Sequence, residues 1–92
     1  MERYIWETPE ETALALAKRL RGIRKRRRIS QEQLSERSGV SYGSIRRFES
    51  SGQISFVSLI RLAAALGCLN EIRSLFTDVA YLSIEEVKNE RS

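Results

Sequence analysis

The chain of 92 residues has 41% hydrophobic and 30% charged side chains, a balance typical of one small globular domain and not of a disordered chain. No apolar run approaches the roughly 20 residues that a membrane span requires, and the acidic N-terminal segment is not expected to be a secretory signal. With no histidine and one cysteine, Cys68, the chain is expected to have no metal site, cofactor or internal disulfide, and to work in the cytoplasm.

Basic residues are concentrated in the middle of the chain. Residues 18–47 contain eleven Lys or Arg and two acidic residues, a local charge of +9, whereas the other residues, with five basic and ten acidic side chains, carry −5. A basic middle between acidic ends favours a polyanion as the partner of the middle. The alternative is a solvated surface without a partner.

The first predicted element is a helix over residues 9–27. Thr8 can cap its start, Pro9 suits the first helical position and Glu11 completes a capping box. The spacing of apolar residues predicts an inward face that is made of Ala13, Leu16, Leu20 and Ile23. The last turn is entirely basic, which complements the helix dipole.

The pattern of residue types over residues 30–49 predicts two short helices joined by a tight turn. Ser30 and Gln33 can form a capping box at the start of the first helix. That helix is expected to end at Gly39, which tolerates the positive φ of a sharp exit, and Ser41 can cap the second helix. The pattern therefore predicts a second helix that begins just after Ser41.

The second helix of this pair has two unlike faces. Ile45 and Phe48 fall on one side, whereas Tyr42, Arg46 and, at the edge, Arg47 fall on the other. One side is expected to pack against the core. The other offers long, polar and cationic side chains to a partner.

Two further helices are expected after a turn at Gly52. Ser55 can cap a helix that ends at Gly67 and whose buried side holds Phe56, Leu59, Ile60, Leu62, Ala63 and Leu66. A fifth helix over residues 69–76 offers three apolar residues to the core: Ile72, Leu75 and Phe76.

The two ends of the chain lie outside this predicted domain. The N-terminal arm, residues 1–8, contains Tyr4, Ile5 and Trp6, which either fold back onto the core or pack across a dimer axis. In the tail, residues 77–92, Ser83 and Glu86 have the spacing of a capping box, so a short terminal helix is expected.

Six residues at fixed spacing carry a family resemblance: Gln31, Ser35, Gly39, Val40, Ile45 and Phe48. At these positions the chain resembles the phage repressor and Cro (XRE-like) helix-turn-helix family, and the similarity extends from about residue 20 to residue 67. The resemblance implies an all-α, compact, five-helix, lambda-repressor-like domain over residues 9–76, with a short C-terminal helical tail. It also implies a dimeric transcriptional regulator, expected to be a repressor, that binds double-stranded DNA with its recognition helix in the major groove.

The resemblance assigns roles to individual residues by position. Base contacts are expected from the recognition helix, at Ser41, Tyr42, Gly43, Arg46 and Arg47. Phosphate contacts are expected from Ser30, Gln31 and Ser44, and the charge of Arg27 and Arg28 should add to them. Arg24 and Glu49 match a pair that forms a partly buried salt bridge in many members. Arg28 departs from the family glycine, so it either adopts a strained left-handed conformation or the helix exits differently.

Three alternative functions are weighed against this one. The chain also resembles, more weakly, HipB-type antitoxins, which bind operator DNA and restrain a HipA-like kinase toxin. RNA binding is compatible with the charge, but the aromatic platforms that stack single-stranded bases are lacking. An enzyme is the least favoured alternative, because Cys68 has no evident base partner and no catalytic constellation is present.

Overall fold

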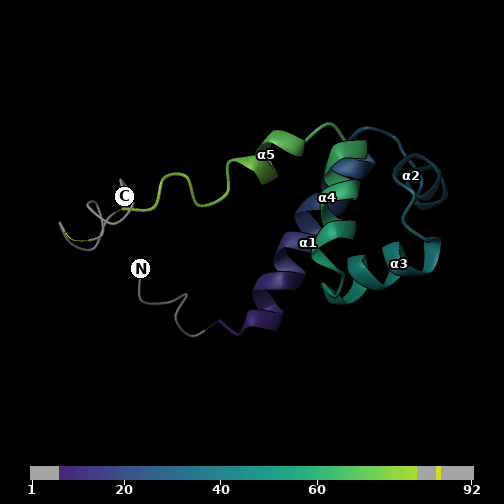
Figure 1. The fold of residues 1–92 in the computed structure, drawn as a ribbon. Helices are drawn as coiled ribbons and strands as arrows, with labels where there is room; N and C mark the ends of the chain where they lie inside the picture. Colours follow the sequence, from purple (N-terminus) through teal and green to yellow (C-terminus); the bar gives the residue numbers. More distant parts are fainter. Residues whose placement is uncertain (1–6, 81–84, 86–92) are drawn as a thin grey trace.

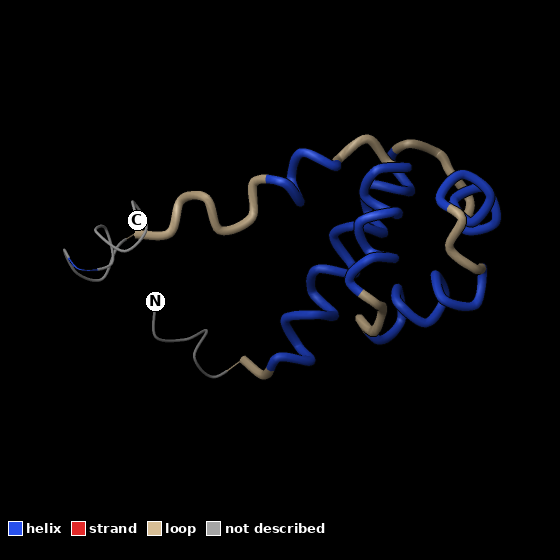
Figure 2. The backbone as a smooth tube through the Cα atoms, viewed as in Figure 1, coloured by secondary structure: helices blue, strands red, loops and turns tan. Residues whose placement is uncertain are grey.

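Five helices make up the part of the chain that the structure describes, residues 7–80 and 85 of a computed structural model (Figures 1 and 2). They are α1 (Pro9–Arg26), α2 (Gln31–Ser38), α3 (Tyr42–Ser51), α4 (Phe56–Ala65) and α5 (Leu69–Arg73). No strand occurs within these residues, so the all-α prediction is confirmed. The N-terminal arm up to residue 6 and nearly all of the predicted terminal helix fall outside the described residues.

The helix starts follow the capping residues of the sequence. The side chains of Thr8, Ser30, Ser41 and Ser55 each accept a hydrogen bond from the backbone three residues later, and Thr8 and Ser30 form complete capping boxes. Such caps satisfy backbone N–H groups that the first helical turn leaves free. The sequence therefore specifies where these four helices begin.

Gly52 ends α3 at a place where no other residue fits well. Its φ of +84° is left-handed, and a Cβ placed there would lie 2.7 Å from backbone atoms of Ala13 and Leu14 in α1. Glycine permits both the conformation and the close approach. Through this contact the end of α3 lies directly against α1.

The core joins all of the first four helices. Its buried hydrophobic residues are Ala17, Ile29, Leu34, Val40, Ile45, Phe48, Leu62, Ala63 and Leu66. α1 packs on α3, and α2 and α5 both pack on α4. The buried positions of Ile45 and Phe48 fix which side of α3 faces outward. None of the helices in the described residues is both long and apolar enough to cross a bilayer.

Two predicted core positions, one in α1 and one in α4, are wrong. Leu16 is 49% exposed, and the neighbouring Ala17 is fully buried in its place. Successive helical residues are about 100° apart, so Ala17 faces the core together with the predicted Leu20 and Ile23, whereas Leu16 lies outside it. Phe56 is 61% exposed, since it occupies the first turn of α4, beyond the edge of the core.

The fifth helix is shorter than predicted. α5 ends at Arg73, and Leu75 and Phe76 are 46% and 83% exposed. Phe76 adopts a positive φ of 67°, which interrupts a helical path. These side chains therefore do not contribute to the core.

Arg28 occupies the left-handed conformation that its family position requires. Its φ is +59°, and two backbone hydrogen bonds close the end of α1, from Arg28 N to Lys25 O (3.0 Å) and from Ile29 N to Arg24 O (3.1 Å). This bonding pattern is a Schellman motif, in which glycine is the common residue. Arg28 therefore carries conformational strain of about 1–2 kcal/mol.

Replacing Arg28 by glycine is expected to stabilise the protein by about 0.5–1 kcal/mol, since relief of strain exceeds the added entropy of the unfolded chain. Urea denaturation measures the difference. Arg27→Gly is the matched control, because it removes the same charge at a residue with an ordinary φ of −87°, and it should destabilise. Equal changes in the free energy of unfolding for the two substitutions would show that Arg28 is not strained.

Candidate nucleic-acid interface

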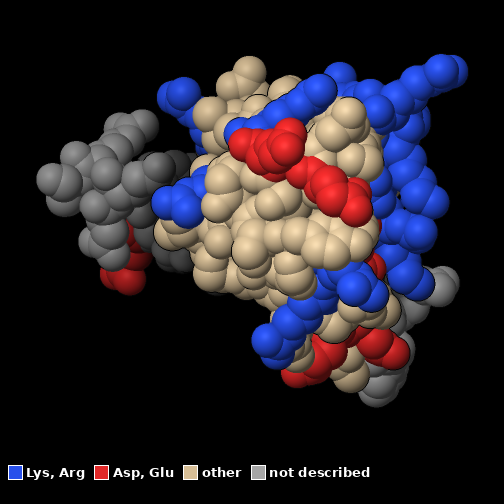
Figure 3. Space-filling view, turned by 90° about the vertical axis from the view of Figure 1, so that its right-hand side faces the viewer, with Lys and Arg blue, Asp and Glu red and all other residues tan. Residues whose placement is uncertain are grey.

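The candidate interface is the outer side of α3 together with the start of α2. Ser41, Tyr42, Gly43, Ser44, Arg46 and Arg47 are all exposed, whereas Ile45 and Phe48 lie behind them in the core. The polar side of the helix is thus available to a partner. Figure 3 views the end of the molecule that carries α2 and α3, and Lys and Arg side chains gather along one edge of that face.

Tyr42 and Arg46 lie together on the outer side of α3. The guanidinium carbon of Arg46 is 5.7 Å from the centroid of the Tyr42 ring, within the range of a cation–π contact. The two residues are one helical turn apart, so the contact holds both side chains on the same surface. Arg46 keeps its guanidinium N–H groups at the surface, where they can meet a carbonyl or phosphate oxygen.

The Arg47 side chain contacts the loop after α3, whereas Arg46 contacts Tyr42. Its guanidinium donates a hydrogen bond to the Gln53 side chain, in the loop between α3 and α4. Its carbonyl accepts hydrogen bonds from the hydroxyls of Ser50 and Ser51, at 3.2 Å and 2.6 Å. Arg47 therefore lies toward the C-terminal end of α3, where it contributes positive charge at the edge of the interface.

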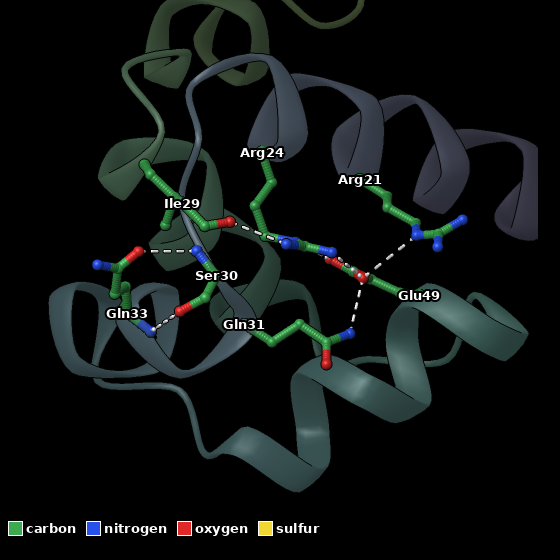
Figure 4. Close-up of polar contacts among 7 residues, drawn as sticks. All are labelled: Arg21, Arg24, Ile29, Ser30, Gln31, Gln33 and Glu49. Atoms are coloured by element: carbon green, nitrogen blue, oxygen red, sulfur yellow. Dashed lines mark hydrogen bonds and ion pairs between the residues drawn. The ribbon is translucent and has the colours of Figure 1, made fainter.

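A buried ion pair connects the end of α3 to α1 (Figure 4). Arg24 donates to Glu49 twice, from Nε to Oε2 at 2.7 Å and from Nη2 to Oε1 at 2.9 Å. Its third nitrogen, Nη1, donates to the carbonyl of Ile29 at 2.8 Å. Both side chains are more than 90% buried. Because the pair joins three segments through a bidentate contact, it fixes the angle of α3 on α1.

Two further residues extend this network. Gln31 donates from Nε2 to Oε1 of Glu49 at 2.9 Å, so the start of α2 is joined to the end of α3. Arg21 lies one turn before Arg24, and its Nε is 3.8 Å from the same oxygen, with about half of its side chain exposed. One N–H of the Gln31 amide is occupied by Glu49, and the other can still donate to a phosphate.

The surroundings of Glu49 favour its charged form. Burial alone raises the pKa, but hydrogen bonds from Arg24 and Gln31 and the positive charges of Arg24 and Arg21 outweigh burial, so the Glu49 pKa lies below its ordinary 4.5. A carboxyl group with a lowered folded-state pKa stabilises the protein above its unfolded pKa. This contribution disappears as the pH falls through the folded-state value.

The free energy of unfolding is therefore expected to decrease as the pH falls below about 4.5, in part through Glu49. Glu49→Gln, which cannot titrate, should be less stable at neutral pH, and its stability should depend less on pH in the acid range. Thermal unfolding of both proteins between neutral and acid pH measures this. Parallel pH profiles would exclude Glu49 as a source of the acid sensitivity.

An open hollow lies between α1, α2 and α3. It has a volume of about 640 Å³ and is lined by Arg21, Gln31, Gly43, Arg46, Arg47, Glu49 and Ser50. Gly43 contributes no side chain, and nothing lies within 4 Å of where its Cβ would be. The hollow brings residues of the predicted base and phosphate sets together around Arg21. Arg21 is not among the contact residues predicted from the sequence, although its place one turn before Arg24 is visible there.

The predicted phosphate residues lie at helix starts and at the end of α1. Ser30 and Ser44 are exposed and take part in the caps of α2 and α3, where backbone N–H groups favour an anion. Arg27 and Arg28 are exposed in the segment that joins α1 to α2. These positions, like the base-contact positions, are geometrically free to contact nucleic acid.

A comparison with protein families identifies this arrangement. Residues 20–69, more than half of the chain, match the model of the helix-turn-helix family HTH_3. The chain belongs to the XRE/Cro-type helix-turn-helix family. Neither the curated proteins nor the solved structures that were compared gave a match. Membership makes the protein a DNA-binding protein of a type that regulates transcription and is typically not an enzyme.

The Cys68 thiol lies outside the candidate interface. Burial raises the pKa of this thiol, which makes it a poor nucleophile.

Proposed function

We propose that this helix-turn-helix protein is a dimeric repressor that reads a specific double-stranded DNA sequence with α3 in the major groove. One observation carries the proposal. α3 exposes Tyr42 and Arg46 together on its outer side while Ile45 and Phe48 anchor its inner side in the core. A helix held in this way can enter a groove without rearrangement, because the major groove admits an α-helix.

In this proposal the exposed residues divide into two groups. Ser41, Tyr42, Arg46 and the edge residue Arg47 read base edges, and Gly43 lets the DNA approach the helix closely. Ser30, Gln31, Ser44, Arg27 and Arg28 bind phosphates and set the register on the duplex. The Arg24–Glu49 pair contributes indirectly, since it holds α3 at a fixed angle.

In this proposal a dimer reads a longer DNA sequence than a single domain can. One domain contacts few base pairs, and a two-fold dimer on two half-sites doubles the number. A repressor needs only to occupy its operator.

Selection of bound sequences from a random duplex library tests the proposal. We expect an inverted repeat with half-site centres about 10 base pairs apart, and log K should fall against log salt by about 0.9 for each phosphate bound. Arg27→Gln and Arg28→Gln should reduce that slope, and Arg73→Gln, an exposed arginine on α5, is the control. A flat salt response, or tighter binding to RNA than to duplex DNA, would contradict the proposal.

A further inference from the structure

One part of the surface is apolar although it lies on a highly charged protein. Leu16, Phe56 and Val57 are 49%, 61% and 58% exposed, and we name these three residues the α1–α4 patch. Leu16 and Phe56 border the same hollow of about 190 Å³, which is lined by Ala13, Leu16, Phe48, Gly52, Ile54, Phe56 and Leu59. The hollow therefore connects Leu16 of α1 with Phe56 of α4 and reaches down to Phe48 in the core, and Val57 follows Phe56 in the first turn of α4.

The start of α4, which forms one side of the patch, carries no charge. Residues 52–60, which include the start of α4, contain no Lys, Arg, Asp or Glu, whereas 30% of the whole sequence is charged. In a two-fold contact the same surface meets itself, so a charged residue near the axis faces its own like charge. An uncharged apolar surface avoids this repulsion and gains from burial. The α1–α4 patch thus has the chemistry of a surface that binds its own copy.

We infer that the α1–α4 patch is the contact between two copies of this chain, with Phe56 and Val57 of each copy packed across a two-fold axis. The inference rests on the proposed function, for which it names the dimer surface. The hollow beside Leu16 can accept the Phe56 ring of the second copy. Contiguous groups of exposed apolar side chains often mark the sites at which proteins bind one another.

The position of the patch relative to α3 agrees with this contact. Four residues, Gly52 to Ser55, separate the end of α3 from the start of α4. A two-fold axis at the patch therefore places the C-terminal ends of the two α3 helices toward each other.

Sedimentation equilibrium of the full chain and of Val57→Glu tests the inference. Val57 is mostly exposed in one chain, so the variant should fold, with an unchanged helical circular-dichroism spectrum at low temperature. Two facing glutamates and the loss of apolar burial should weaken dimerisation by at least about 100-fold. Val79→Glu is the matched control, since Val79 is 68% exposed in the segment after α5, and its dimer should be unchanged.

An equimolar mixture of Val57→Glu and Val57→Lys gives an independent test. If residue 57 lies near the two-fold axis, the opposite charges should restore association as a heterodimer. A wild-type chain that stays monomeric, a Val57→Glu protein that still dimerises, or dissociation caused by Val79→Glu instead would overturn the inference.

DNA binding separates this inference from the proposed function. The Val57→Glu monomer should bind a duplex with one half-site as tightly as wild type does, and should lose cooperative binding to the full inverted repeat. Sedimentation without DNA judges the dimer surface alone. Failure of the wild-type chain to bind any duplex would contradict the proposed function and leave the sedimentation result to decide the surface.

Discussion

Replacing Glu49 by alanine is expected to destabilise the protein by about 3–5 kcal/mol. Glu49 accepts two hydrogen bonds from Arg24 and one from Gln31, and its removal leaves the Arg24 guanidinium buried without a counter-charge. Small domains have total stabilities of about 5–15 kcal/mol, so this loss is a large fraction. DNA affinity should fall together with stability, since the angle of α3 on α1 is no longer fixed. Urea denaturation and duplex binding at low temperature measure the two effects.

Arg21→Ala is the matched control for the Glu49 substitution. Arg21 approaches the same carboxylate at 3.8 Å but is half exposed, so its removal should change stability by less than about 1 kcal/mol. Its effect on DNA binding can be larger, because it lines the hollow beside Gly43. Equal losses of stability for the two variants, or an unchanged melt for Glu49→Ala, would show that the pair does not anchor α3.

The starts of the first four helices and the end of α2 are predictable from the sequence because they depend on local chemistry. Ser30 with Gln33, and Thr8 with Glu11, form their hydrogen bonds within one turn of the chain. The left-handed exit at Gly39 likewise depends on one residue. None of these features needs a distant contact, so the pattern of residue types was sufficient to place the helix-turn-helix.

The errors arise where tertiary packing decides. The spacing of apolar residues predicted Leu16 in the core, yet α1 packs with the small Ala17 inward. Phe56 and Phe76 are apolar enough for a core, but one lies at its edge and the other follows the end of α5. Hydrophobic periodicity predicts which residues can be buried. It does not predict how far the core extends.

In the candidate site, too, features that depend on local chemistry were predictable, and features that depend on tertiary packing were not. The outward direction of Tyr42 and Arg46 follows from helical periodicity alone. By contrast, the place of Arg21 beside Glu49 requires α1 and α3 to be in contact, as does the hollow that Gly43 opens. The link between Arg47 and Gln53 depends on the path of the loop after Gly52. Sequence reasoning predicted the two faces of α3 and the Arg24–Glu49 pair, and it missed Arg21 and the contact between Arg47 and Gln53.

Replacing Arg46 by alanine is expected to reduce discrimination between the operator and unrelated duplexes by about 1–3 kcal/mol, a loss of roughly 5- to 150-fold. The reason is geometric. An arginine that projects from the middle of a groove-bound helix can donate two parallel hydrogen bonds to O6 and N7 of one guanine. Stability should stay within about 0.5 kcal/mol of wild type, since the side chain is exposed and its contact with Tyr42 is weak. Competition binding with operator and scrambled duplexes measures the discrimination.

Arg46→Lys distinguishes base reading from charge. Lysine keeps the positive charge, so the salt dependence of binding should be retained, but its single ammonium group cannot reproduce the two-pronged contact. We therefore expect Arg46→Lys to lose most of the discrimination that Arg46→Ala loses, while Arg47→Ala, whose guanidinium is bound to Gln53, loses less. If Arg46→Lys instead retains full discrimination and only Arg46→Ala weakens binding equally to all sequences, then Arg46 binds phosphate. In that case the side chains left to read bases are those of Ser41, which caps α3, and of Tyr42 and Arg47 on α3.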